Sequence, residues 1–138
     1  MHSYIHKVQY YETDQMQVAH HSNYIRWMEE ARTDYLDSVG ISYAEMERRG
    51  IISPVLTVSC QYHTMTRYGE RVRVETRLTE MGSVRYRLAY RIVDAETGEL
   101  RAVGESTHCF INPDNRVISL KKADPDAFTR MREKVEHE

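Results

Sequence analysis

The sequence has few cysteines and prolines and no long apolar run, and each shortage excludes a class of protein. Its 2 cysteines, Cys60 and Cys109, form no CxxC pair, which argues against a zinc site and against a secreted disulfide framework. Its 3 prolines and 6 glycines form no linker or low-complexity segment. No stretch is apolar enough for a signal peptide or a membrane span. We therefore expect a single domain over residues 1–138 in the cytoplasm.

Charge of one sign is also missing, whereas tyrosine is abundant. Lysine plus arginine number 19 and aspartate plus glutamate 21, so no basic excess indicates nucleic-acid binding and no acidic tail is present. The chain has 10 tyrosines against 2 phenylalanines. Aromatic rings with a polar group suit surfaces that are half apolar and half wet, so the excess points to interfaces or clefts.

Apolar side chains repeat with two periods near the N-terminus. Residues 4–11 alternate with a period of two, which predicts a strand. From Ser22 to Gly40 the period becomes helical, with Ser22 or Asn23 as the expected N-cap and Gly40 as the stop. The apolar stripe of this helix consists of Tyr24, Trp27, Met28, Ala31, Tyr35 and Leu36. A short second helix is expected to follow from Ser42.

Strand patterns dominate the second half of the chain. We expect strands over 53–63, 71–80, 84–92, 100–111 and 116–120, joined as an antiparallel meander, and a final helix over 126–135. The helices are not interleaved between the strands. The order therefore predicts an α+β fold in which an antiparallel sheet of about five to six strands wraps around one long central helix.

The segment between the first strand and the long helix carries the candidate chemistry. It places Asp14 shortly before a helix N-terminus, where the amides around His20, His21 and Ser22 lack intrahelical partners and bear partial positive charge. Such amides can stabilise an oxyanion, while the aspartate attacks a bound carbonyl carbon or activates water. This arrangement suffices to hydrolyse an activated acyl compound.

At this segment the sequence resembles the hotdog-fold acyl-CoA thioesterases of the 4-hydroxybenzoyl-CoA thioesterase, YbgC and FadM type. The most specific part is Thr13-Asp14, then His21 and Tyr24, followed by a helix that begins Arg-Trp-Met-Glu-Glu-Ala-Arg at residues 26–32. Weaker matches are the segments 67–70 and 82–85. The resemblance implies a hotdog fold, an acyl-CoA substrate, no cofactor, and homodimers, commonly paired into homotetramers, with active sites at subunit interfaces.

The resemblance also implies roles for individual residues. The catalytic carboxylate corresponds to Asp14, and the amide that polarises the thioester carbonyl corresponds to the helix start at His21. Tyr11 is a further catalytic candidate, although Tyr10 is an alternative because some relatives carry the tyrosine four residues before the aspartate. Residues 15–17 replace a glycine-containing turn. The substrate-binding candidates are Asn23, Tyr24, Arg67 and Ser83.

Other interpretations of these residues remain open. Asp14 could form only an Asx turn, and His21 could make only a hydrogen bond at the helix start. A metal site at His20 and His21 is disfavoured because adjacent residues seldom reach one ion. CoA phosphates could be held by arginine and lysine side chains, although some of these could instead be a solvated strand face: Arg67, Arg85, Arg87, Arg91, Arg116, Lys121 and Lys122.

Two other functions compete with a thioesterase. A non-catalytic acyl-CoA binding or sensing protein on the same fold would be expected to lack the aspartate or to carry a regulatory domain, and neither holds for this sequence. A hotdog dehydratase would place its histidine and carboxylate differently along a helix. We therefore expect an acyl-CoA thioesterase.

Overall fold

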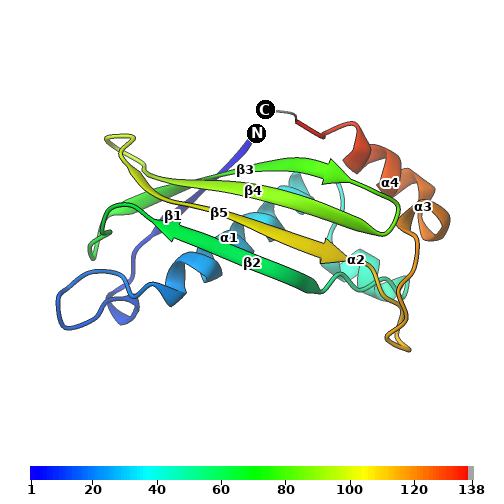
Figure 1. Ribbon diagram of the computed structural model, residues 1–138, viewed down its shortest axis with the longest axis horizontal. Helices are drawn as coiled ribbons and strands as arrows, with labels where there is room; N and C mark the ends of the chain where they lie inside the picture. Colours follow the sequence, from blue (N-terminus) through cyan, green and yellow to red (C-terminus); the bar gives the residue numbers. More distant parts are fainter. Residues whose placement is uncertain (137–138) are drawn as a thin grey trace.

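Five antiparallel strands form one sheet that lies against a long helix (Figure 1). The computed structural model describes residues 1–136. The strands are β1 (His2–Lys7), β2 (Val55–Tyr62), β3 (Arg71–Met81), β4 (Arg85–Asp94) and β5 (Leu100–Cys109), in the order β1-β3-β4-β5-β2. The helices are the 3-10 helix η1 (Tyr10–Glu12), then α1 (Ser22–Ser38), α2 (Tyr43–Arg48), α3 (Leu120–Ala123) and α4 (Pro125–Arg132). The predicted α+β class and the sheet around one long helix are confirmed.

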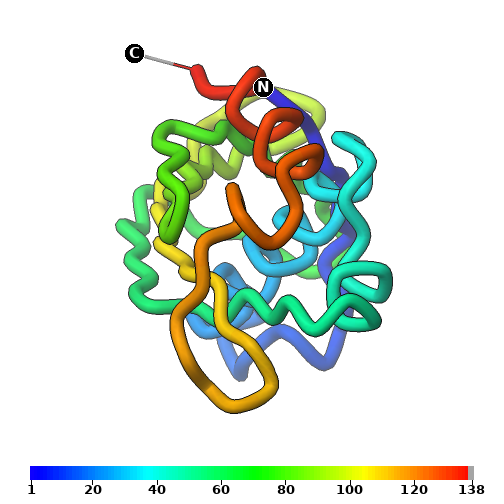
Figure 2. The backbone as a smooth tube through the Cα atoms, turned by 90° about the vertical axis from the view of Figure 1, so that its right-hand side faces the viewer, coloured from blue at the N-terminus to red at the C-terminus, as the bar shows by residue number. Residues whose placement is uncertain are grey.

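Helix α1 buries its apolar stripe against the sheet, as the helical period predicted. Trp27 and Ala31 are fully buried, and Tyr24, Met28 and Tyr35 nearly so. In Figure 2 the sheet curves around this helix, with β1 (dark blue) on one side of it and β2 (green) on the other. The helix ends before Gly40, whose φ of 81° is the left-handed conformation that glycine adopts most easily. The expected N-cap was wrong, because His21 occupies that position and makes no side-chain cap.

The strand pattern needs three corrections. β1 ends at Lys7 instead of residue 11, because the chain turns into η1. No strand covers 116–120: Val117 makes only an isolated bridge to Ile111, and α3 begins at Leu120. The strands are also not one simple meander, because β2 pairs with β5 and β1 pairs with β3. β1 therefore occupies the place beside β3 that the meander gave to β2, and β2 lies at the opposite edge, beside β5.

Close packing of α1 on the sheet depends on Gly104 in β5. A Cβ atom at this position would lie 2.6 Å from the sulfur of Met28 and 2.6 Å from the carbonyl oxygen of Ser59. We expect Gly104→Ala to lower the free energy of unfolding by about 1–3 kcal/mol through overpacking. Urea denaturation measures the change. Gly82→Ala is the control, because its Cβ would approach the Arg85 carbonyl no closer than 3.4 Å; equal stability of both variants would contradict the expectation.

A chain of polar side chains is buried between the sheet and α1. The Nε2 atom of His108 lies 2.7 Å from Ser106 Oγ, which lies 2.7 Å from the hydroxyl of Tyr90. The ring of Tyr86 stacks on His108 at 4.7 Å. Burial, aided by the charge of Arg32, lowers the pKa of His108 from 6.5 to about 3. His108 is therefore neutral in the folded protein at ordinary pH.

This low pKa predicts a loss of stability in mild acid. The unfolded chain binds a proton at this histidine near pH 6.5, whereas the folded chain does not until about pH 3. The free energy of unfolding should therefore fall as the pH drops below 6.5, by about 1.5 kcal/mol between pH 6.5 and 5 from this group alone. Denaturation of wild type and His108→Gln at both pH values measures the difference. Equal pH dependence in the two proteins would show that His108 does not cause the loss.

Candidate active site

A short hairpin over residues 13–19 presents Asp14 to solvent. Thr13 bridges Ala19, and the Asp14 amide donates to the Val18 carbonyl at 3.0 Å. Gln17 has a φ of 63°, which is the left-handed conformation that glycine adopts most easily. It belongs to residues 15–17, which by the resemblance replace a glycine-containing turn. The Asp14 Oδ1 atom accepts the Met16 amide at 2.8 Å, which is an Asx turn. Its Oδ2 atom has no partner within residues 1–136.

The N-terminus of α1 offers a free backbone donor beside this hairpin. The amide of His20 donates to the Glu12 carbonyl at 2.9 Å, and the amide of Ser22 approaches His20 Nδ1 at 3.3 Å. Between them, the His21 amide has no acceptor within the described chain. It lies at the positive end of a 17-residue helix. This donor can hydrogen-bond a carbonyl oxygen that gains negative charge.

An aromatic side chain from the edge strand β2 lies over the helix start. The Tyr62 hydroxyl donates to the His21 carbonyl at 3.1 Å, and its ring meets Tyr24 edge-on at 5.1 Å. Partial burial and the neighbouring Cys60 raise the pKa of Tyr62 to about 12. Tyr62 was not identified as a candidate from the sequence. The only signal there is its place near the end of a predicted strand, and no pattern in the sequence relates it to His21.

The structure brings several predicted site residues together. Asp14 and His21 lie at the two ends of the same loop. Arg67 lies beside this loop, because its main chain forms an isolated β-bridge with Val18 of the hairpin. Tyr11 and its alternative Tyr10 both belong to η1, and their side chains are 84% and 75% exposed. Both tyrosines are therefore available to a ligand, and geometry does not choose between them.

Of the other predicted substrate-binding residues, Asn23 and Tyr24 lie at the helix start with buried side chains, and only Ser83 lies elsewhere. Asn23 is buried and donates to the Glu12 carbonyl at 2.8 Å, and the buried Tyr24 donates to Thr66 Oγ1 at 3.0 Å. Asn23 thus holds η1 to the helix, and Tyr24 holds the helix to the connection between β2 and β3. Ser83 lies in the β3–β4 turn, at the far end of β3 from Arg71 and the hairpin, and its carbonyl accepts the Leu120 amide. Ser83 is about 30 Å from the hairpin, by the rise of an extended strand over the length of β3.

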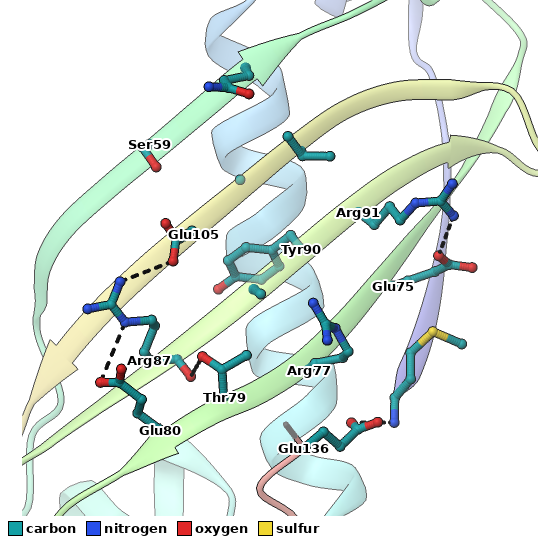
Figure 3. Close-up of a pocket in the computed structure, with 15 residues that line it drawn as sticks. Ser59, Glu75, Arg77, Thr79, Glu80, Arg87, Tyr90, Arg91, Glu105 and Glu136 are labelled. Carbon is teal, nitrogen blue, oxygen red and sulfur yellow. Dashed lines mark hydrogen bonds and ion pairs between the residues drawn. The ribbon is translucent and has the colours of Figure 1, made fainter. Parts of the chain in front are cut away.

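A hollow of about 780 Å³ lies away from these residues on the sheet face opposite α1 (Figure 3). Charged side chains from β3, β4 and β5 line it in pairs. Arg87 contacts Glu105 at 3.1 Å, and Arg91 contacts Glu75 at 3.2 Å. A bound anion would have to compete with these carboxylates. The hollow is therefore a charged sheet surface, and volume alone does not locate the site.

Comparison with known proteins identifies the family. A family model described as the thioesterase-like superfamily matches residues 8–136. A solved DHNA-CoA thioesterase from Staphylococcus aureus is 36% identical, with a TM-score of 0.89 over 95% of this chain and 90% of that one. The hypothetical protein TT1821 from Thermus thermophilus is 33% identical, with a TM-score of 0.88 over 96% and 98%.

A third relative agrees with this family. The acyl-CoA thioester hydrolase YbgC of Escherichia coli O6:H1 is 27% identical over 90 residues, which are 65% of this chain and 67% of the relative. No helix within residues 1–136 is long and apolar enough to cross a membrane. The resemblance found in the sequence is confirmed, and the chain belongs to the thioesterase-like superfamily of hotdog-fold thioester hydrolases.

Proposed function

We propose that this protein hydrolyses the thioester of an acyl-CoA to the free acid and CoA, with Asp14 and the His21 amide as the reacting pair. The observation that carries the proposal is the free His21 amide at the N-terminus of α1, joined by hydrogen bonds to the segment that bears Asp14. The His20 amide donates to the Glu12 carbonyl at 2.9 Å, and the Asn23 side-chain amide donates to the same carbonyl at 2.8 Å. These bonds place an oxyanion donor and an exposed carboxylate at the two ends of one short loop.

The chemistry follows from these two groups. The thioester carbonyl oxygen accepts the His21 N–H, which stabilises the negative charge that develops on it. Asp14 then acts in one of two ways: it attacks the carbonyl carbon to form an anhydride that water hydrolyses, or it takes a proton from the attacking water. In both routes the C–S bond breaks and CoA leaves as its thiolate. A thiolate is a good leaving group, so no strong general acid is required.

We further propose that the active unit is a homodimer joined through β2. The sequence of this edge strand, Val55–Tyr62, contains no charged residue, and Val55, Leu56 and Val58 are exposed along it. Edge strands that stay unpaired are usually protected by charge or proline. Tyr62 extends this edge to the helix start at His21. A partner strand would therefore lie next to the reacting groups, and a dimer of such dimers remains a prediction.

Antiparallel pairing of two β2 strands would also explain the position of Ser83. The Val55 end of β2 pairs with His108, next to Cys109 and Arg85, so it lies at the same end of the sheet as the β3–β4 turn. A two-fold axis would set this end beside the partner's Tyr62. Ser83 would then bind substrate across the interface, while Arg67 would bind it within the protomer.

A panel of acyl thioesters tests the proposal. The panel contains DHNA-CoA, the compound named for the relative from Staphylococcus aureus, with other aromatic, short-chain and long-chain acyl-CoAs and one acyl-carrier-protein thioester. We expect thiol release from at least one acyl-CoA. Tight CoA binding without release from any of them would support the non-catalytic binding protein instead.

Both cysteines are free, and a cytoplasmic location stays a prediction.

A further inference from the structure

Glu12 is a buried carboxylate that the proposed reaction does not use. It is 5% exposed, and both of its oxygens are occupied. Oε1 accepts the Gln9 amide at 2.7 Å and the Nε2–H of His6 at 2.8 Å. Oε2 accepts the indole N–H of Trp27 at 2.8 Å. The side chain therefore ties β1, η1 and α1 to one point.

The donors around Glu12 favour its ionised form. Burial by itself would raise the pKa of Glu12, but the Gln9 amide, His6 and Trp27 outweigh burial and hold the pKa below its ordinary value. The amide and the indole N–H can only donate, so a protonated or amidated side chain would lose acceptors that these groups need. A carboxylate is thus the one form that satisfies the whole set.

The main chain of the same residue ties down the helix start. The Glu12 carbonyl accepts the Asn23 side-chain amide at 2.8 Å and the His20 amide at 2.9 Å. The residue after His20 supplies the free amide, and the residue two positions after Glu12 is Asp14. One buried residue, Glu12, therefore fixes the positions of both reacting groups and does not itself reach the substrate.

We propose that Glu12 is a positioning residue that sets the distance and direction between Asp14 and the His21 amide. This inference rests on the proposed thioesterase function and adds to it a requirement for the Glu12–Trp27–His6 contacts. Misplacement of a reacting group by about 1 Å can cost on the order of 100-fold in rate. Substrate binding depends on other surfaces, so the effect should fall on kcat and leave KM nearly unchanged.

The variant Glu12→Gln tests this role. The amide nitrogen of the glutamine must face either the Trp27 N–H or the donors of Gln9 and His6. In either orientation two donor groups face each other, and neither has an acceptor. We expect kcat to fall roughly 10- to 100-fold, with KM and CoA affinity changed by less than about threefold. Glu30→Gln is the matched control, because Glu30 also lies near His6, at 3.4 Å from Nδ1, but makes no contact with the hairpin. Its kcat should stay at the wild-type value.

A second substitution separates positioning from folding. Trp27→Phe removes the opposed indole donor, so the double variant Glu12→Gln/Trp27→Phe should recover part of the kcat lost by Glu12→Gln alone. A wild-type kcat in Glu12→Gln, with Asp14→Asn inactive, would overturn the positioning role and leave the proposed function standing. Loss of cooperative unfolding in Glu12→Gln, or no recovery in the double variant, would make Glu12 structural only. No turnover in the wild type would overturn both.

Discussion

Asparagine in place of Asp14 is expected to lower kcat/KM for thioester hydrolysis by at least about 1,000-fold. The amide is nearly the same size as the carboxylate, but it neither attacks a carbonyl carbon nor takes a proton from water. The turn should survive, because the Asn Oδ1 atom can still accept the Met16 amide that Asp14 accepts at 2.8 Å. Steady-state thiol release on purified protein measures the loss.

Two controls make this result specific to the reaction. CoA affinity and the melting temperature of Asp14→Asn should match those of the wild type, because Asp14 is exposed and carries no buried contact. Asp37→Asn, an equal substitution near the other end of α1, should keep full activity. Thiol release by Asp14→Asn at close to the wild-type rate would make Asp14 only an Asx-turn residue.

Lysine in place of Val58 is expected to dissociate the proposed β2–β2 dimer and remove most of the activity. Val58 is 40% exposed on the edge strand β2, and its neighbours on the same strand carry no charge. Two lysines brought together across a β2–β2 interface would each lose water and repel the other. The site should lose activity because Tyr62, beside His21, belongs to the same edge. Light scattering gives the molar mass, and thiol release gives the activity.

The opposite sheet edge supplies the matched control. Ile5 on β1 is 50% exposed, and Ile5→Lys makes the same change at that edge. It should leave the protein dimeric and active. A dimeric Val58→Lys protein, or a wild-type protein that is monomeric at micromolar concentration yet fully active, would show that β2 is not the interface.

Local pattern was sufficient to predict most elements of the fold. The helical stripe from Tyr24 to Leu36 and the alternation in β3 and β4 reflect contacts with one face of a neighbouring layer, which a short window of sequence records. The order of the strands was not predictable in this way. β2 pairs with β5 and β1 with β3, and these pairings depend on contacts between distant residues that periodicity does not encode.

The same division applies to the candidate site. Asp14 and His21 lie within one short segment, so a motif could propose them as reacting groups. Tyr62 and Glu12 act through partners 41 and 15 residues away, and neither lies in a pattern that names its partner. Substrate binding by Asn23 and Tyr24 stays a prediction, and the structure gives both side chains partners inside the protein.

The most direct test of the central claim is the ratio of kcat/KM for thiol release between wild type and Asp14→Asn, measured on the best acyl-CoA of the panel with equal amounts of folded protein. We expect a ratio of at least about 1,000. A ratio near one, or a wild type that releases thiol from no acyl-CoA, would contradict thioester hydrolysis by Asp14.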